Sequence, residues 1–147
     1  MAAAYRRQKP REEAELLLRL KHLRGLLEVG WRAAPRGAAA VPSHGQCAAT
    51  AIVIQRLLGG LLVSTTVNGT SHWLNRVPVG ASCYDIDLTG DQFGFAPVQV
   101  GSVGGLYPNT RVRLTSEVHE ETLGRAQELE RNSGFKRPHS YWLRAAS

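Results

Sequence analysis

The sequence has few cysteines and no long apolar run. Its two cysteines, Cys47 and Cys83, are too few for the disulfide framework of a small secreted domain. No stretch approaches the roughly 18 consecutive apolar residues that a transmembrane helix needs. The N-terminus carries charges where a signal peptide has its apolar segment. These absences predict a cytoplasmic protein without a membrane partner.

The composition is that of one ordinary folded domain. Of 147 residues, 43% are hydrophobic and 20% are charged, a balance that excludes collagen-like and wholly disordered chains. A chain of this length buries most of its surface in one core, so folding needs neither metal nor disulfides. We therefore expect a single domain over residues 1–147. The bias toward Ala, Arg and Gly indicates a GC-rich bacterial genome.

The net charge of +6 is unevenly distributed along the chain. Residues 1–37 carry nine Lys and Arg against four Glu, residues 38–110 carry two against three acids, and residues 111–147 carry seven against five. Nucleic-acid surfaces need clustered cations, with aromatic side chains among them for stacking. Here the cations are mixed with Glu in the flanking helical segments, so we predict no nucleic-acid partner.

The first helix is predicted over residues 10–29. Pro10 suits a helix start, and Gly30 stands where a stop is expected. Leucines at helical spacing share one face, which we expect in the core: Leu16, Leu20, Leu23 and Leu27.

A central helix is predicted within residues 44–60, opening at or near Cys47. The segment is almost uncharged and stops at Gly59 and Gly60. A run of β-branched residues leaves a strand possible by pattern, but the small alanines favour a helix.

Strands in meander order are predicted to follow the central helix. They span residues 61–67, 70–77 and 82–88. Asn68-Gly69, between the first two, is the strongest short signal for a hairpin. The Gly- and Pro-rich stretch 94–113 is expected at the surface with one short strand.

A final helix is predicted over about 116–132, with Ser116 as its N-cap and Asn132 to Gly134 as its stop. The predicted fold class is α+β, with a central helix packed on an antiparallel sheet. The core that carries the candidate site spans about 43–115.

Cys47 is the first candidate for chemistry. A thiol at a helix N-terminus faces unpaired backbone N–H groups and the positive end of the dipole, which both favour the thiolate. The N–H of Cys47 itself can donate to an oxyanion formed at an attacked carbonyl. The alternative is a free cysteine that fills space in the core.

A thiol nucleophile needs a base, and His72 lies mid-strand in the hairpin that follows the Cys47 helix. The alternative is a structural histidine on the sheet. A third group then holds the imidazole in one orientation, and the next strand offers Asp85 and Asp87 on one face. We favour Asp87, for which capping the following turn is the competing role.

Metal binding by Cys47, His72 and Asp87 has no support from spacing. The sequence contains neither the C-x-x-C nor the H-E-x-x-H pattern of zinc sites. We predict no metal and no cofactor.

Three segments together resemble a known family: GQCAATAIVIQRLLGG (45–60), SHWLNRVPVG (71–80) and YDIDLTGDQF (84–93). They are similar to the YunG-type family of small bacterial proteins, which share a Cys, a His-x-x-Asn and an Asp-Leu-Thr pattern. The likeness extends from about Trp31 onward.

The order of Cys on a helix, His on a strand and Asp on the next strand also resembles papain-like and transglutaminase-like thiol enzymes. That resemblance implies that Cys47 attacks a carbonyl, His72 acts as the base and Asp87 orients it. It also implies a papain-like or transglutaminase-like core.

The resemblance raises two further site candidates. The papain-type glutamine that serves the oxyanion stands several residues before the cysteine, where this chain has Val41, so Gln46 is the residue available. Asn75 belongs to the family-like motif and is either structural or substrate-positioning.

The leading hypothesis is an enzyme that acts on an amide through a Cys-His-Asp triad and a covalent acyl-enzyme. Peptidase, deamidase and acyltransferase activity all stay open. The expected substrate is a peptide, a protein side chain or a small amide.

Two alternatives come from other classes of protein. One is a non-catalytic interaction module that keeps the fold and docks a partner through the basic N-terminal helix or the 94–113 stretch. The other is a redox sensor that links Cys47 to Cys83.

Overall fold

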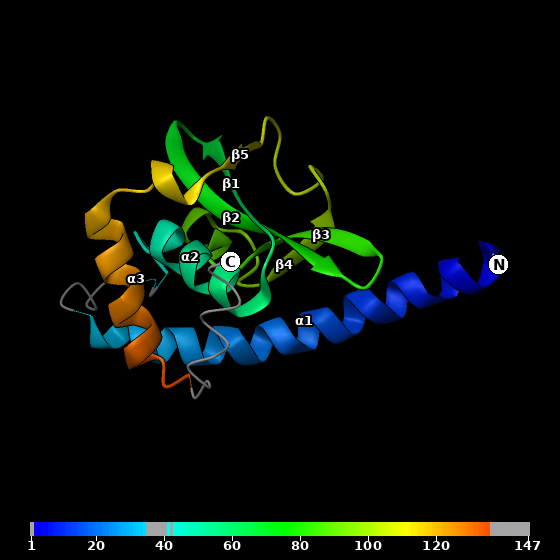
Figure 1. Ribbon diagram of the computed structural model, residues 1–147, viewed down its shortest axis with the longest axis horizontal. Helices are drawn as coiled ribbons and strands as arrows, with labels where there is room; N and C mark the ends of the chain where they lie inside the picture. The colour runs from blue at the N-terminus through cyan, green and yellow to red at the C-terminus, as the bar shows by residue number, and fades with distance from the viewer. Residues whose placement is uncertain (1, 35–40, 42, 136–147) are drawn as a thin grey trace.

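The computed structural model describes residues 2–34, 41 and 43–135. Its helices and strands are α1 (Ala2–Ala33), α2 (Cys47–Leu58), β1 (Leu61–Val67), β2 (Thr70–Val79), β3 (Ser82–Asp87), β4 (Gln99–Ser102), β5 (Arg111–Arg113) and α3 (Glu120–Asn132). Short 3₁₀ turns occupy Gly90–Phe93 and Thr115–Glu117. The chain is thus α+β, as predicted (Figure 1).

The strands form an antiparallel sheet in the order β4-β3-β2-β1-β5. β1, β2 and β3 are joined in sequence, which confirms the predicted meander. The β1–β2 turn places Asn68 at φ 50° and Gly69 at φ 78°. A two-residue turn with both residues left-handed matches the twist of the flanking strands, which is why Asn-Gly is favoured there.

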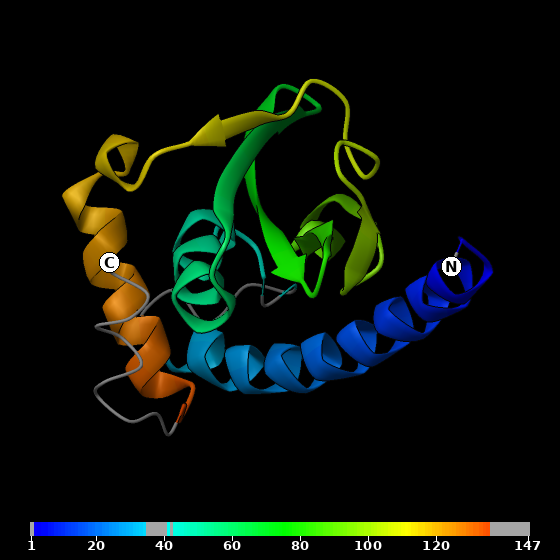
Figure 2. The same ribbon diagram turned by 45° about the vertical axis from the view of Figure 1, so that its right-hand side comes forward.

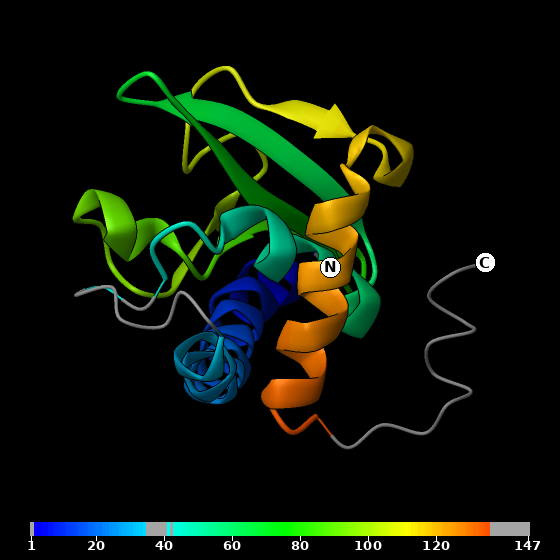
Figure 3. The ribbon, with the colours of Figure 1, turned by 90° about the vertical axis from the view of Figure 1, so that its left-hand side faces the viewer.

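One face of the sheet packs against the helices. α2 lies on β2, α3 packs across α1 and α2, and α1 runs the length of the molecule (Figures 1 to 3). The main core between these elements contains buried residues from α1, α2, α3 and this sheet face. Leu16, Leu20 and Leu27 are buried and Leu23 is partly buried against them, so the predicted leucine face is confirmed.

The opposite face of the sheet carries a second, smaller core. Val63, Val67 and Leu74 from β1 and β2 pack there with Tyr107, and Phe93 and Leu106 close over them. The stretch 94–113 therefore differs from the surface excursion with one strand that its composition predicted. It contributes β4 and β5, and it buries Tyr107 against the sheet.

The predicted bounds of the first helix are wrong at both ends. α1 begins at Ala2, so Pro10 lies inside it, and it continues through Gly30 to Ala33. Alanine has the highest intrinsic helix propensity, which favours extension through the alanine-rich start. At the other end, packing overrides the stop signal at Gly30, because Trp31, the next residue of the helix, is buried in the core.

The last helix begins later than predicted. Ser116 falls in the 3₁₀ turn Thr115–Glu117, and α3 starts at Glu120. His119 is the N-cap residue, and its side chain Nδ1 accepts a hydrogen bond from the Glu121 N–H at 3.1 Å. The predicted stop is confirmed, since α3 ends at Asn132.

In the described part of the chain, no helix combines the length and the apolar character needed to cross a bilayer.

Gly30 of α1 lies directly against Leu129 and Ser133 at the end of α3, and this contact yields the first prediction. A Cβ at Gly30 would lie 2.3 Å from Ser133 Oγ and 2.8 Å from Leu129 Cδ1. We expect Gly30→Ala to lower the free energy of unfolding by about 1–3 kcal/mol through overpacking.

Gly25 is the matched control because it lies in the same helix and a Cβ there meets nothing within 4 Å. Gly25→Ala should raise the free energy of unfolding by about 0.5–1 kcal/mol. Denaturant titration measures both variants, and an equal gain in stability for the two would contradict this account of the α1–α3 contact.

Candidate functional site

The site is organised by a buried contact between β2 and β3. The β2–β3 ladder runs from Asn75–Ile86 to Val79–Ser82, and the two strands carry His72 and Asp87 beyond it. There His72 Nε2 lies 2.7 Å from Asp87 Oδ2. His72 is fully buried and Asp87 is 1% exposed, so this contact is closed to water.

The Asp87 carboxylate is compensated by hydrogen-bond donors on both oxygens. Tyr107 Oη donates to Oδ2, the oxygen that faces His72, while Thr89 donates to Oδ1 from its backbone N–H at 2.9 Å and its hydroxyl at 3.3 Å. Gln99 Nε2 in turn donates to Tyr107 Oη at 2.9 Å. A buried charge needs such donors to offset its lost hydration.

Tyr107 acts in this cluster as a protonated donor. Burial and the neighbouring Asp87 carboxylate raise the pKa of Tyr107, so its hydroxyl keeps its proton. Tyr107 also packs edge-on to the His72 ring at 5.3 Å between centroids, and Phe93 does so at 4.9 Å. The two aromatic rings fix the plane of the imidazole as well as covering it.

The His72 ring is held in a charged state by its neighbours. Burial alone would lower the pKa of His72, but the hydrogen bond with Asp87 and the interaction with Cys47 outweigh it and raise the pKa to about 9. Because Nε2 is engaged by Asp87, Nδ1 is the nitrogen left for Cys47. Nδ1 is buried, and within the described residues it has no hydrogen-bond partner.

Cys47 is the first residue of α2, which confirms the predicted helix start. It is partly exposed, and both Cys47 and Cys83 are free thiols. Gln46 occupies the N-cap position, but its side chain makes no capping hydrogen bond. The first backbone N–H groups of α2 therefore lack the side-chain partner that usually satisfies them.

A buried cation on α1 ties the segments around the site together. The Arg24 guanidinium donates to both oxygens of Asp91, at 3.0 and 2.8 Å, and to the carbonyls of Leu88 at 2.9 Å and Pro97 at 3.0 Å. Arg24 is 6% exposed. It thereby links α1 to the chain that follows β3 and leads away from Asp87.

The same network reaches the turn before Cys47. Asp91 Oδ1 accepts a hydrogen bond from the Ser43 hydroxyl, and the Ser43 carbonyl accepts one from the Gln46 N–H at 3.0 Å. Burial alone would raise the pKa of Asp91, but its hydrogen bonds from Arg24 and Ser43 lower it. Arg24 and Asp91 thus fix the turn that leads into the first residue of α2.

The other predicted site residues lie elsewhere. Asp85 shares a face with Asp87, as predicted, but it accepts hydrogen bonds from Arg76 Nε at 2.7 Å and from the Gly104 N–H at 2.8 Å. It therefore does not hold His72.

Asn75 points to the opposite sheet face, where its Nδ2 donates to the Ala51 carbonyl at 2.8 Å and joins β2 to α2. That contact is structural.

Sequence reasoning missed Tyr107, Arg24 and Asp91. Tyr107 lies in a Gly- and Pro-rich stretch where no periodic pattern indicates burial. Arg24 follows Leu20 by four residues and precedes Leu27 by three, so a cation on an otherwise apolar helix face was the available signal.

Within the described ranges, no group of three or more His, Cys, Asp and Glu side chains is arranged to hold a metal ion.

Fold and site together define a small α+β protein with a cysteine at a helix N-terminus and a buried His–Asp pair that interacts with it. The model of the family described as YunG protein matches residues 19–129, so the chain belongs to the YunG family. This confirms the family resemblance of the sequence motifs.

A relative in Bacillus subtilis (strain 168), named Uncharacterized protein YunG, is 29% identical over 104 residues. The match covers 69% of this chain and 83% of that protein. The relative is bacterial, in agreement with the composition. No solved structure matches the chain.

The charge on His72 yields a prediction for its titration. Its pKa of about 9 means that the ring keeps its proton through neutral pH, and NMR of the ring should give a midpoint near 9. Since the folded-state pKa lies above the usual 6.5, charged His72 stabilises the fold fully below pH 6.5. That contribution is lost as the pH rises through 9.

Asp87→Asn should move the midpoint of His72 toward lower pH because it removes the negative partner. Asp85→Asn is the matched control, two residues away on the same strand and face but bonded to Arg76 instead. A His72 midpoint that is the same in Asp87→Asn and in the unaltered protein would contradict the geometry described above.

The Arg24 network yields a prediction for stability. Arg24→Gln should lower the free energy of unfolding by about 3 kcal/mol, because it leaves a partly buried carboxylate and two carbonyls without their donor. Arg19→Gln, at an exposed position of the same helix, should stay within about 0.5 kcal/mol of the unaltered protein. Denaturant unfolding measures both variants. An equal loss of stability in the two would contradict a stabilising role for the Arg24 hydrogen bonds.

Proposed function

We propose that the protein is a thiol-dependent enzyme that acts on an amide through a triad of Cys47, His72 and Asp87. The observation that carries this proposal is the state of His72. Its ring is held between a fully bonded carboxylate and the thiol of Cys47, and the two raise its pKa to about 9. A histidine with only a structural role needs no interaction with a cysteine at a helix N-terminus.

The raised pKa of His72 implies how the reaction begins. For the thiol to attack, its proton must pass to His72 Nδ1, which gives a thiolate beside an imidazolium, and the pKa of about 9 at His72 favours the protonated ring at neutral pH. The thiolate attacks the carbonyl carbon of the substrate amide and forms a C–S bond. The carbonyl electron pair moves onto oxygen, which becomes an oxyanion.

The intermediate then collapses with His72 as the acid. The oxyanion re-forms the carbonyl, the C–N bond breaks, and the Nδ1 proton of His72 passes to the departing amine. A thioester on Cys47 remains. Water or an amine, deprotonated by His72, attacks it and releases the thiolate of Cys47 with an acid or a new amide as product.

The helix N-terminus supports stabilisation of the oxyanion. The uncapped N–H groups at the start of α2 include that of Cys47, and backbone donors of this kind stabilise negative charge as it forms. Gln46 can add a side-chain donor because its amide is not used for capping. Asn75 takes no part in this step, since its amide is bonded to the Ala51 carbonyl.

The proposal includes a papain-like or transglutaminase-like core. It is supported by the order of a nucleophile on α2, a base on β2 and an orienting acid on β3, with the helix packed on the antiparallel sheet. The substrate we propose is a peptide, a protein side chain or a small amide. Hydrolysis and acyl transfer share every step up to the thioester.

Alkylation of the two cysteines tests the proposal within one molecule. We expect iodoacetamide to modify Cys47 at pH values low enough that Cys83 has become unreactive, because imidazolium His72 stabilises the Cys47 thiolate. Peptide mapping by mass spectrometry reads the two rates separately. Cys83 is exposed, so its rate serves as the internal control for an ordinary thiol.

His72→Ala should abolish this difference, and Cys47→Ala should abolish covalent labelling by acyl-type electrophiles. If Cys47 follows the same pH dependence as Cys83 and His72→Ala changes nothing, the enzyme proposal fails and the interaction module takes its place. A disulfide between Cys47 and Cys83 in non-reducing mass analysis would favour the redox sensor.

A further inference from the structure

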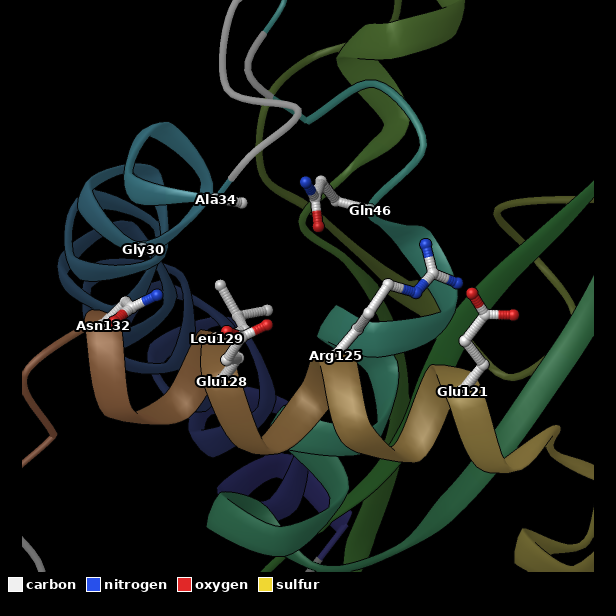
Figure 4. A pocket seen from close by; sticks show the side chains of 8 residues that line it. All are labelled: Gly30, Ala34, Gln46, Glu121, Arg125, Glu128, Leu129 and Asn132. Atoms are coloured by element: carbon white, nitrogen blue, oxygen red, sulfur yellow. The ribbon is translucent and has the colours of Figure 1, made fainter.

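A cavity of about 230 Å³ opens beside the N-terminus of α2 (Figure 4). The end of α1 forms one wall, a face of α3 forms another, and the N-cap residue of α2 lies at a third. Its lining residues are Gly30, Ala34, Gln46, Glu121, Arg125, Glu128, Leu129 and Asn132. None of the reactions described above accounts for this cavity.

The polar lining from α3 follows one helical stripe. Glu121, Arg125, Glu128 and Asn132 are spaced four, three and four residues apart, so they share the face that α3 turns to the cavity. Their side chains are seen along this face in Figure 4. The stripe therefore presents one cation flanked by two anions to whatever occupies the space.

Arg125 has an unused donor at this position. Its Nη2 donates to Thr122 Oγ1 at 3.2 Å, but Nε is buried, and no acceptor for it exists in the described part of the chain. A surface stripe of this spacing would normally pair Arg125 with Glu121 one turn away. Arg125 as a whole is only partly buried, and a ligand in the cavity can supply the acceptor that its Nε lacks.

The cavity is next to the proposed nucleophile. Gln46 lines it, and Cys47 is the following residue, about 3.8 Å away along the backbone. Cys47 itself does not line the cavity, so Gln46 is the residue that connects the cavity to the nucleophile. The uncapped N–H groups of α2 lie at the same end of the helix.

Size and charge restrict what the cavity can hold. At about 230 Å³ it is smaller than the roughly 300–1,000 Å³ of pockets for drug-sized ligands. A purely anionic ligand would pair with Arg125 but be repelled by the carboxylates of Glu121 and Glu128. A purely cationic ligand would leave Arg125 without an acceptor. A small zwitterion satisfies both signs of charge.

We propose that the cavity binds the α-carboxylate and α-ammonium groups of a single amino acid, with Arg125 on the carboxylate and the Glu121 and Glu128 carboxylates near the ammonium. The side-chain amide of such a molecule then extends toward Cys47. The substrate class is thus a free amino acid that carries an amide. The reaction of the bound amide with Cys47 rests on the proposed function, whereas binding of the amino acid in the cavity does not.

Calorimetric titration of the Cys47→Ala protein tests binding apart from turnover. The probes are L-glutamine, glutaramic acid, which lacks its ammonium, γ-aminobutyramide, which lacks its carboxylate, and butanamide, which lacks both. We expect L-glutamine to bind more tightly than each of the other three. Loss of a charged hydrogen-bond partner should weaken binding about tenfold to a hundredfold.

Arg125→Gln in the same background should weaken L-glutamine by a similar factor and leave γ-aminobutyramide unchanged, because that probe has no carboxylate to lose. Arg131→Gln is the matched control, since Arg131 is exposed on the same helix and does not line the cavity. It should leave every affinity unchanged. Melting temperatures of the variants check that each is folded.

The outcomes separate this proposal from the proposed function. Zwitterion-selective binding that depends on Arg125 supports the cavity assignment even if Cys47 proves unreactive. Equal binding of butanamide and L-glutamine, or no binding of any probe, overturns it even if Cys47 reacts as an enzymatic thiol. An effect of Arg131→Gln equal to that of Arg125→Gln also overturns it.

Discussion

The structure around the site depends on one buried negative charge, the carboxylate of Asp87. A carboxylate removed from water must be surrounded by donors, and here they come from distant parts of the chain. His72 approaches from β2, Thr89 from the residues just after β3, and Tyr107 from the loop beyond β4. Compensating this charge therefore specifies where each of these segments lies. It also sets the protonation of His72, since Asp87 is a main contributor to its raised pKa.

A second charged cluster, Arg24 with Asp91, fixes the positions of helices α1 and α2, as the Asp87 cluster fixes the strands and loops around it. Arg24 on α1 and Asp91 after β3 compensate each other, and Ser43 connects them to the turn that enters α2. Asp87 and Asp91 are four residues apart, so the chain between them carries both clusters. A short segment thereby couples the geometry of His72 to the position of the α2 N-terminus. The chemistry of a thiol there depends on this coupling, because the thiol and the imidazole belong to separate elements.

The N-terminus of α2 is where these constraints meet. It is left without a side-chain cap, and it lies beside both His72 and the cavity along α3. Helix ends that have no internal partner for their N–H groups are usually satisfied by a side chain or by water. This helix end lacks the stabilisation that a side-chain cap would provide. The unused Nε of Arg125 follows the same pattern on the other side of the cavity.

The sequence by itself determined the local features: a helix that opens at or near Cys47 and stops at Gly59, the Asn68-Gly69 hairpin, and the shared face of Asp85 and Asp87. Each follows from interactions within a few residues, such as turn dihedrals, side-chain alternation and helix stop signals. Only the tertiary structure decided which aspartate meets His72, that Gly30 continues a helix, and that Tyr107 and Arg24 are buried. These outcomes depend on contacts between residues that are far apart in the chain. Arg76 donates a hydrogen bond to Asp85, α3 packs against Gly30, and Arg24 donates to Asp91 across the fold.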